Sequence, residues 1–263
     1  MQLSDIDKGN SFDWGKTSQD YAKFRDIYPP EFYQMLINRN IGTKGQKILD
    51  LGTGTGVLPR NMYPYGADWT GIDIAENQIA QAQILAKTNN MQINFQAVSA
   101  EECHFPENSF DIVTACQCFW YFNPESLMPI LQTILKPKGR LCILQMEWLP
   151  FEDEIAQASE NLVLQYNPDW SGAGETRHPV FIPERVLDDM ELIHHEEWAI
   201  AIPFTRESWN GRMKACRGIG ASLSESEITA WEQEHFALLE RIAPQTFTIL
   251  HYVAMAELQL KGN

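Results

Sequence analysis

A glycine-rich turn after a short apolar run is the part of the sequence best suited to hold a ligand. Residues 48–51 lead into Gly52, Gly54 and Gly56, which alternate with threonines. Glycines accept a positive φ, and without a Cβ they let a ligand approach the backbone closely. A helix that begins here offers unpaired N–H groups and the positive end of its dipole to an anionic group. The turn predicts a binding site for a small organic ligand.

Two acidic residues flank this turn in the order that a nucleoside site requires. Asp50 precedes the turn, and Asp73 ends the next apolar run, 17 residues after Gly56. An acidic residue at that place in a doubly wound fold hydrogen-bonds ribose hydroxyls, so we expect a ligand that contains ribose. The alternative is that both carboxylates only cap helices or turns. Val57 stands where the dinucleotide fingerprint has a third small residue, which disfavours NAD or FAD.

Apolar runs and helical patterns alternate along the first 147 residues. This alternation is typical of βαβ units and predicts a doubly wound α/β fold with a parallel sheet. We expect strands at 47–51, 69–74, 92–98, 110–115 and 140–146, with helices at 76–88 and 125–135 and an earlier helix after Pro29-Pro30.

The rhythm changes after residue 148, where helical stretches and two further strands are expected. Residues 153–166 are helical in pattern, residues 193–203 and 247–258 are strand candidates, and Ser224 with Glu227 forms a capping box before a helix. We expect one domain over residues 1–263. Its parts are an N-terminal arm and helix at 1–45, a ligand-binding core at 46–147, and substrate-cover insertions with closing strands at 148–263.

The composition and charge of the chain disfavour some kinds of binding partner. A formal net charge of −15, with no basic run, disfavours nucleic acid. The sequence shows no secretory signal, that is, no basic segment followed by an apolar stretch at its start. It also shows no apolar run of about 18 residues that could span a bilayer, so we expect a cytoplasmic protein without a membrane partner. Five cysteines without a C-x-x-C pair indicate reduced thiols and no metal site.

Four stretches, in order and at the right spacing, resemble class I S-adenosylmethionine-dependent methyltransferases. Residues 50–56 resemble the first motif of that family, and Gly-Ile-Asp-Ile at 71–74 resembles its ribose-binding strand end. Residues 99–111 are similar to the stretch before its fourth strand, and residues 135–141 to the entry to its fifth. The resemblance covers about residues 46–147 and is closest to the small-molecule branch with the ubiquinone-biosynthesis and trans-aconitate enzymes.

This resemblance implies both a fold and a cofactor. The fold is a Rossmann-like methyltransferase fold, with a mostly parallel seven-stranded sheet, helices on both faces, an antiparallel last strand and C-terminal helical insertions as a cover. The cofactor is S-adenosylmethionine. By the same resemblance, Gly52 and Gly54 lie against its methionine part, Asp50 orients its ammonium group, and Asp73 holds the ribose hydroxyls.

The remaining cofactor contacts also follow from the resemblance. Ile74 is expected to pack on the adenine, the backbone of Ala100 to contact it with Glu101 beside it, and Gln117 to meet the methionine moiety. Ser99 stands where the family often has Asp, which weakens or changes the contact to the adenine amino group. Tyr21 and Arg25 of the arm are expected to close over the cofactor carboxylate, or else to form a stacked pair on a surface helix.

Two residues are candidates for proton transfer. Glu147 ends the fifth expected strand, and His178 lies in the glycine-rich loop that follows. A base is needed only when the nucleophile is a protonated oxygen or nitrogen. The alternatives are that Glu147 bonds Arg177 and that His178 has no catalytic task. The family often has His where Trp120 stands, so a further possible base is absent.

The leading hypothesis is transfer of a methyl group from S-adenosylmethionine to a small-molecule acceptor by in-line displacement. The sulfonium already makes the methyl group electrophilic, so the protein mainly aligns the nucleophile. A non-catalytic S-adenosylmethionine-binding or scaffold protein is the alternative, favoured by Ser99 and Trp120. An NAD-dependent oxidoreductase is the least favoured hypothesis because of Val57.

Overall fold

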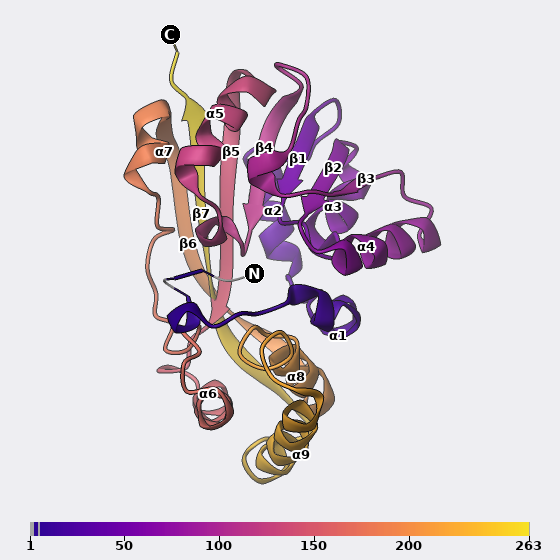
Figure 1. Ribbon diagram of the computed structural model, residues 1–263, viewed down its shortest axis with the longest axis vertical. Coiled ribbons are helices and arrows are strands. Elements are labelled where there is room, and N and C mark those ends of the chain that lie inside the picture. Colours follow the sequence, from indigo (N-terminus) through magenta and orange to yellow (C-terminus); the bar gives the residue numbers. More distant parts are fainter. Residues whose placement is uncertain (1–2, 5, 263) are drawn as a thin grey trace. The chain divides into compact units, whose positions relative to one another are not determined.

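A computed structural model of the chain describes residues 3–4 and 6–262. The described chain divides into two compact units (Figure 1). The core unit comprises residues 28–146, 178–198 and those from 253 onward. The helical unit comprises the described part of residues 1–27 together with residues 147–177 and 199–252.

A seven-stranded sheet runs through the described residues in the order β3-β2-β1-β4-β5-β7-β6 (Figure 1). Its strands are β1 (Lys47–Leu51), β2 (Asp68–Asp73), β3 (Asn94–Ala97), β4 (Phe110–Cys116), β5 (Leu135–Trp148), β6 (Met190–Thr205) and β7 (Thr246–Leu260). The first five are parallel, and β7 is antiparallel to β5 and β6. This is the Rossmann-like methyltransferase fold that the sequence predicts.

The centre of the sheet is apolar because helices and loops of the core unit cover it. Within β1, Ile48, Leu49 and Leu51 are fully buried, as expected for a parallel strand covered on both faces. Leu51 pairs with Ile72 of β2 and with Ala115 of β4. The three strands therefore end at the same edge, which brings together the segments that follow them.

The α-helices in the described residues of the core unit are α2 (Pro30–Asn38), α3 (Val57–Met62), α4 (Glu76–Thr88), α5 (Pro124–Ile134) and α7 (Glu184–Asp189). The expected helix after Pro29-Pro30 is confirmed, with Phe32, Met35 and Leu36 buried. Asn123 is the N-cap of α5, and its side chain accepts hydrogen bonds from the N–H groups of Glu125 and Ser126.

The helical unit, as far as the structure describes it, contains the α-helices α1 (Ser18–Phe24), α6 (Glu154–Tyr166), α8 (Arg206–Lys214) and α9 (Glu225–Ile242). The predicted capping box of α9 is confirmed, because Ser224 and Glu227 each bond the other's backbone N–H. Trp231 and Trp209 are fully buried in this unit's hydrophobic core.

The strand expected at 140–146 begins earlier than its pattern indicates. Leu135 pairs with Phe110, and the next pair is Arg140 with Ile112. Residues 136–139 bulge out between these pairs, and Lys138 has a φ of 63°. The two lysines, the proline and the glycine of this bulge interrupt the apolar pattern, so hydropathy does not indicate where the strand begins. None of the helices in the described residues is both long and apolar enough to cross a membrane.

Candidate functional site

The glycine-rich turn between β1 and α3 needs the backbone freedom that its glycines provide. Gly52, Gly54 and Gly56 have φ values of 58°, 56° and 74°, in the left-handed region that favours glycine. The N–H of Thr53 donates to the Ile72 carbonyl at 2.9 Å. A Cβ on Gly56 would lie 2.6 Å from the Phe95 ring. The turn is thus held against β2 and β3 in one conformation.

Asp73, at the end of β2, is hydrogen-bonded to that turn. Its Oδ2 accepts from the N–H of Gly54 at 2.9 Å, and its Oδ1 accepts from the N–H of Ala75 at 2.8 Å. Burial raises the pKa of Asp73, and the two N–H groups oppose that effect. The carboxylate remains partly exposed, and each oxygen keeps a lone pair that can accept from a ribose hydroxyl.

Ile74 follows Asp73 and has 60% of its side-chain surface exposed. A large aliphatic side chain this exposed, beside a ribose-binding carboxylate, offers an apolar surface to a base. The packing of Ile74 on adenine remains a prediction, and the exposure of its side chain is consistent with that prediction.

Asp50 is 2% exposed and bonded by two hydroxyls. Thr53 donates to Oδ2 and Thr114 to Oδ1, both at 2.6 Å. Burial raises the pKa of Asp50 to about 7, while the two hydroxyls oppose that effect. Asp50 therefore fixes the turn to β4, and its predicted role toward the cofactor ammonium would use its remaining lone pairs.

Gln117, just after β4, combines backbone strain with a buried acceptor that is unpaired within the described residues. Its φ is 66°, uncommon for a residue with a Cβ. The N–H donates to the Leu144 carbonyl at 2.9 Å, and Nε2 donates to the Met146 carbonyl. Its Oε1 is buried without a hydrogen-bond partner there. Such an acceptor fits a ligand donor, for example an ammonium group.

The residues that are expected to lie near the adenine belong to the loop before β4. Ala100 is buried, and its carbonyl accepts from the thiol of Cys103. The Ser99 hydroxyl donates to Glu101 at 2.6 Å, and the other oxygen of Glu101 accepts from the Asn123 N–H at 3.0 Å. Glu101 therefore joins this loop to the start of α5, a role that the sequence pattern does not show.

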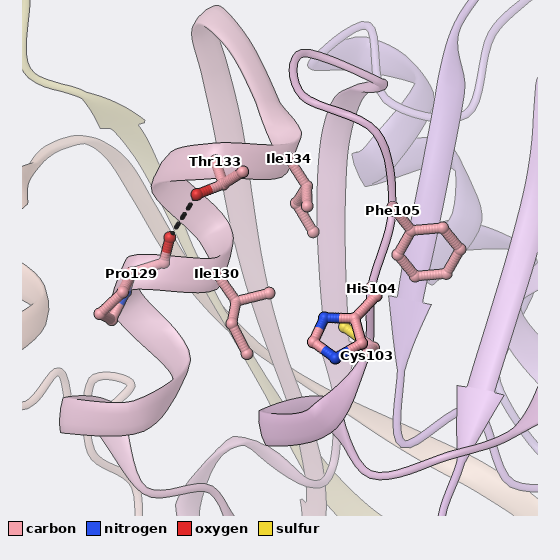
Figure 2. A pocket seen from close by; sticks show the side chains of 7 residues that line it. All are labelled: Cys103, His104, Phe105, Pro129, Ile130, Thr133 and Ile134. Atoms are coloured by element: carbon pink, nitrogen blue, oxygen red, sulfur yellow. Dashed lines mark hydrogen bonds between the residues drawn. The ribbon is translucent and has the colours of Figure 1, made fainter.

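The core unit also has a cavity of about 260 Å³ between this loop and α5 (Figure 2). Its lining consists of Cys103, His104, Phe105, Pro129, Ile130, Thr133 and Ile134. The Thr133 hydroxyl donates to the Pro129 carbonyl, as Figure 2 shows. None of the predicted site residues lines this cavity, so the cavity does not mark the predicted cofactor site.

Tyr21 and Arg25 belong to the helical unit. The Arg25 guanidinium lies 4.7 Å from the centre of the Tyr21 ring, and Trp14 meets the same ring edge-on. The stacked pair that the sequence allowed is thus present. Closure of both residues over a cofactor carboxylate remains a prediction.

The two residues expected to transfer protons belong to different units. Glu147, in the helical unit, is partly exposed, and burial raises its pKa to about 7, against the opposing charges of Arg212 and Arg25. Its alternative partner Arg177 instead donates to both oxygens of Glu152 at 2.8 Å. His178, in the core unit, is partly exposed, with Nδ1 2.7 Å from the Pro179 carbonyl oxygen.

Some buried polar residues of the helical unit could not be predicted from the sequence pattern. Arg212 in α8 and His251 in β7 are almost fully buried, and both have side-chain nitrogens without partners in the described chain. Arg212 lies among polar residues typical of a solvent-exposed helix, which conceals its burial. Groups of three metal-ligating side chains are absent from the residues that the structure describes.

The fold and the turn geometry define a Rossmann-like methyltransferase domain, and comparisons with known proteins agree. Residues 49–143 match the model of a methyltransferase domain family. The chain is 30% identical over 201 residues to a ubiquinone biosynthesis O-methyltransferase of Acinetobacter baumannii, covering 72% of this chain and 82% of that protein. It is 31% identical to the Chromobacterium violaceum enzyme of the same name over 48% of this chain and 54% of that protein. The match thus spans about half the length of the latter relative.

Solved structures show the same fold at low sequence identity. YcgJ of Bacillus subtilis superposes with a TM-score of 0.51 at 17% identity, covering 87% of this chain and 98% of that one. The [4+2]-cyclase SpnF superposes with a TM-score of 0.55 at 16% identity, covering 97% and 98%. The chain belongs to the class I S-adenosylmethionine-dependent methyltransferase family, in which S-adenosylmethionine is the methyl donor.

Proposed function

We propose that the chain transfers a methyl group from S-adenosylmethionine to an oxygen of a small-molecule acceptor by in-line displacement. The observation that carries this proposal is the hydrogen bond between the Gly54 N–H and the Asp73 carboxylate, which holds a glycine turn and a carboxylate together at one sheet edge. The name of the Acinetobacter baumannii relative supports an oxygen nucleophile.

The residues of the core unit fit the cofactor. Asp73 would hold the ribose hydroxyls, the exposed Ile74 would pack on the base, and the unpaired Oε1 of Gln117 would accept from the ammonium group. Bound there, the cofactor supplies a methyl group already activated by its sulfonium. The remaining barrier is lowered mainly by orientation of the nucleophile.

Glu147 is our candidate for the base. A phenol or alcohol must lose its proton during methyl transfer, and a base is most effective when its pKa is near the working pH. The pKa of about 7 for Glu147 meets this requirement. His178, whose Nδ1 faces a carbonyl oxygen, is the second candidate.

Binding and stereochemistry test the proposal in two stages. Isothermal titration should show that both S-adenosylmethionine and S-adenosylhomocysteine bind. If neither compound binds at millimolar concentration, the chain does not bind the cofactor. With an accepted substrate, a chiral methyl group should be transferred with inversion. Retention would contradict a single in-line displacement.

A non-catalytic or differently catalytic role is the second candidate, because the [4+2]-cyclase SpnF shares the fold. It predicts cofactor binding without any methylated product from a panel of phenols, alcohols, carboxylic acids, amines and thiols. Detection of a single methylated product would contradict it.

A further inference from the structure

Arg212, in α8, is a buried cation, and two of its three side-chain nitrogens have no hydrogen-bond partner in the described residues. Its side chain is 1% exposed, and neither Nε nor Nη1 has a hydrogen-bond partner in the described chain. The Trp148 ring lies 4.8 Å from the guanidinium carbon and attracts the charge, but a ring face does not replace in-plane acceptors. A buried guanidinium with unmade hydrogen bonds is unfavourable, which points to a ligand that completes it.

The packing of α8 fixes where this guanidinium lies. The indole N–H of Trp209 donates to the Ser159 hydroxyl at 2.9 Å, and Asn210 bonds His235 at 2.8 Å. A Cβ on Gly211 would lie 2.3 Å from the ring of Phe24 in α1, so the two helices pack together closely. Arg212 is therefore held between well-anchored residues of the helical unit.

Within the described part of this unit, no carboxylate is hydrogen-bonded to Nε or Nη1 of Arg212. Glu147 attracts the guanidinium but leaves Nε and Nη1 unbonded. Glu160 accepts instead from the Trp148 indole at 2.6 Å and from the Gly174 N–H at 2.9 Å. The planar fork of an arginine matches two oxygens of one carboxylate, and no described residue provides such a pairing at Nε and Nη1.

His251 of β7, which is affected by the charge of Arg212, has a ring nitrogen that can accept a hydrogen bond and has no partner in the described residues. It is fully buried, and the charges of Arg212 and Arg25 act on it. Nδ1 lies 3.0 Å from the Ile249 carbonyl, which can only accept, so Nδ1 carries the proton. Its Nε2 lone pair has no partner in the described residues. A ligand here would therefore combine an anionic group with an O–H or N–H donor.

We propose that Arg212 binds the carboxylate of the methyl acceptor, which makes the acceptor an organic acid. His251 accepts a hydrogen bond from a hydroxyl or amino group of the same molecule. This inference rests on the proposed function. The acceptor is favoured over the cofactor as the source of the carboxylate because the stacked pair of Tyr21 and Arg25 is already the predicted partner of the cofactor carboxylate.

The test uses the full chain saturated with S-adenosylhomocysteine, so that the cofactor's own carboxylate is already bound. Benzoate, 4-hydroxybenzoate, phenylacetate and succinate are titrated at constant ionic strength, each against its neutral amide. We expect at least one acid to bind at least tenfold more tightly than its amide. Arg212→Met should weaken that acid at least tenfold while changing S-adenosylhomocysteine affinity less than threefold.

A matched control separates this role from a structural one. Arg217 is also buried in the helical unit, but its Nε lies 2.9 Å from Asp7 and its Nη2 donates to Ser171 at 3.0 Å. Arg217→Met should lower the urea midpoint and retain binding of the acid. Arg212→Met should leave that midpoint unchanged or raise it, because an incompletely bonded charge is removed.

Four results would overturn the inference. The first is that no acid binds more tightly than its amide, and the second is that Arg212→Met still binds the acid. The third is that Arg212→Met has a lower urea midpoint, and the fourth is that this variant loses affinity for S-adenosylhomocysteine. The last would assign Arg212 to the cofactor. Arg212→Lys, which keeps the charge without the fork, should retain the fold and bind the acid at intermediate strength. Failure of the wild-type chain to bind S-adenosylhomocysteine would instead count against the proposed function.

Discussion

The Asp73 carboxylate accepts a hydrogen bond from the Gly54 backbone N–H, with 2.9 Å between Oδ2 and N. This bond joins the end of β2 to the turn after β1, two segments that are 19 residues apart in the chain. The acid is thus oriented by the protein before any ligand is present, which lowers the entropic cost of binding.

Replacing Asp73 with Ala should abolish most of the affinity for S-adenosylhomocysteine. Hydrogen bonds to a charged group contribute about 1.5–3 kcal/mol each, so a loss of about 10- to 100-fold or more is expected by isothermal titration. Asp111→Asn is the control, because Asp111 bonds the Lys47 N–H and pairs with Lys136. Unchanged affinity in a folded Asp73→Ala variant would remove the basis for the cofactor site.

Gly56→Ala should destabilise the chain more than Gly174→Ala. Both glycines have a φ between 70° and 80°, and that conformation costs a residue with a Cβ about 1–2 kcal/mol. At Gly56 the new Cβ would also lie 2.6 Å from Phe95, whereas at Gly174 the nearest atom is 3.7 Å away. Urea denaturation should show the larger loss of unfolding free energy for Gly56→Ala. Equal losses would mean that the Phe95 ring moves aside without cost.

The core unit was predictable from sequence because its signals are local. Buried parallel strands produce short apolar runs; the glycine turn directly follows one of them, and Asp73 is the last residue of another. The helix over residues 76–88 has the bounds that its pattern predicts. The bulge at residues 136–139 was missed because its proline and glycine interrupt the pattern of a strand that begins before them.

The helical unit was less predictable because its polar contacts join distant segments. Arg212 and Glu147 are 65 residues apart, and the tie between Trp209 and Ser159 joins residues 50 positions apart. The segment of α8 is rich in charged and polar residues, so its pattern indicates an exposed helix. Tertiary packing instead buries Trp209, Asn210 and Arg212 together.

Glu147→Gln should lower kcat/KM for a protonated oxygen acceptor by about 10²- to 10⁴-fold, the usual contribution of a general base. Because only the carboxylate form accepts a proton, the wild-type rate should rise with pH through about 7. The variant should lose that rise. His178→Gln is the parallel test of the second candidate, and an unchanged wild-type pH profile in Glu147→Gln would exclude Glu147 as the base.

The raised pKa of Glu147 also predicts a pH dependence of stability. The pKa is 4.5 in an ordinary setting and about 7 in the folded chain, so between these values the folded state binds more protons than the unfolded state. Stability attributable to Glu147 should therefore fall as pH rises from about 4.5 to 7. The difference corresponds to at most roughly 3 kcal/mol. Urea curves should show a smaller fall in Glu147→Gln, and parallel curves would contradict the shift.

The ion group around Glu257 predicts the largest stability change outside the site. Glu257 is fully buried, accepts from Arg39 at 2.8 Å, and also accepts from Arg140. Arg140 further donates to the Asn40 carbonyl at 2.7 Å. Arg140→Met leaves a buried carboxylate short of donors, which costs roughly 3–5 kcal/mol of unfolding free energy.

The double variant Arg140→Met with Glu257→Met should recover much of that loss, because it removes the buried carboxylate as well, and the remaining Arg39 is partly exposed to water. Lys136→Met is the control: its pair with Asp111 is partly exposed, so its removal should cost about 1 kcal/mol or less. Arg140 pairs with Ile112 near the start of β4, whereas Gln117 follows the end of that strand, so affinity for S-adenosylhomocysteine should stay unchanged in the folded variants. A double variant no more stable than Arg140→Met would show that the loss comes from packing and backbone contacts of Arg140 rather than from the buried charge.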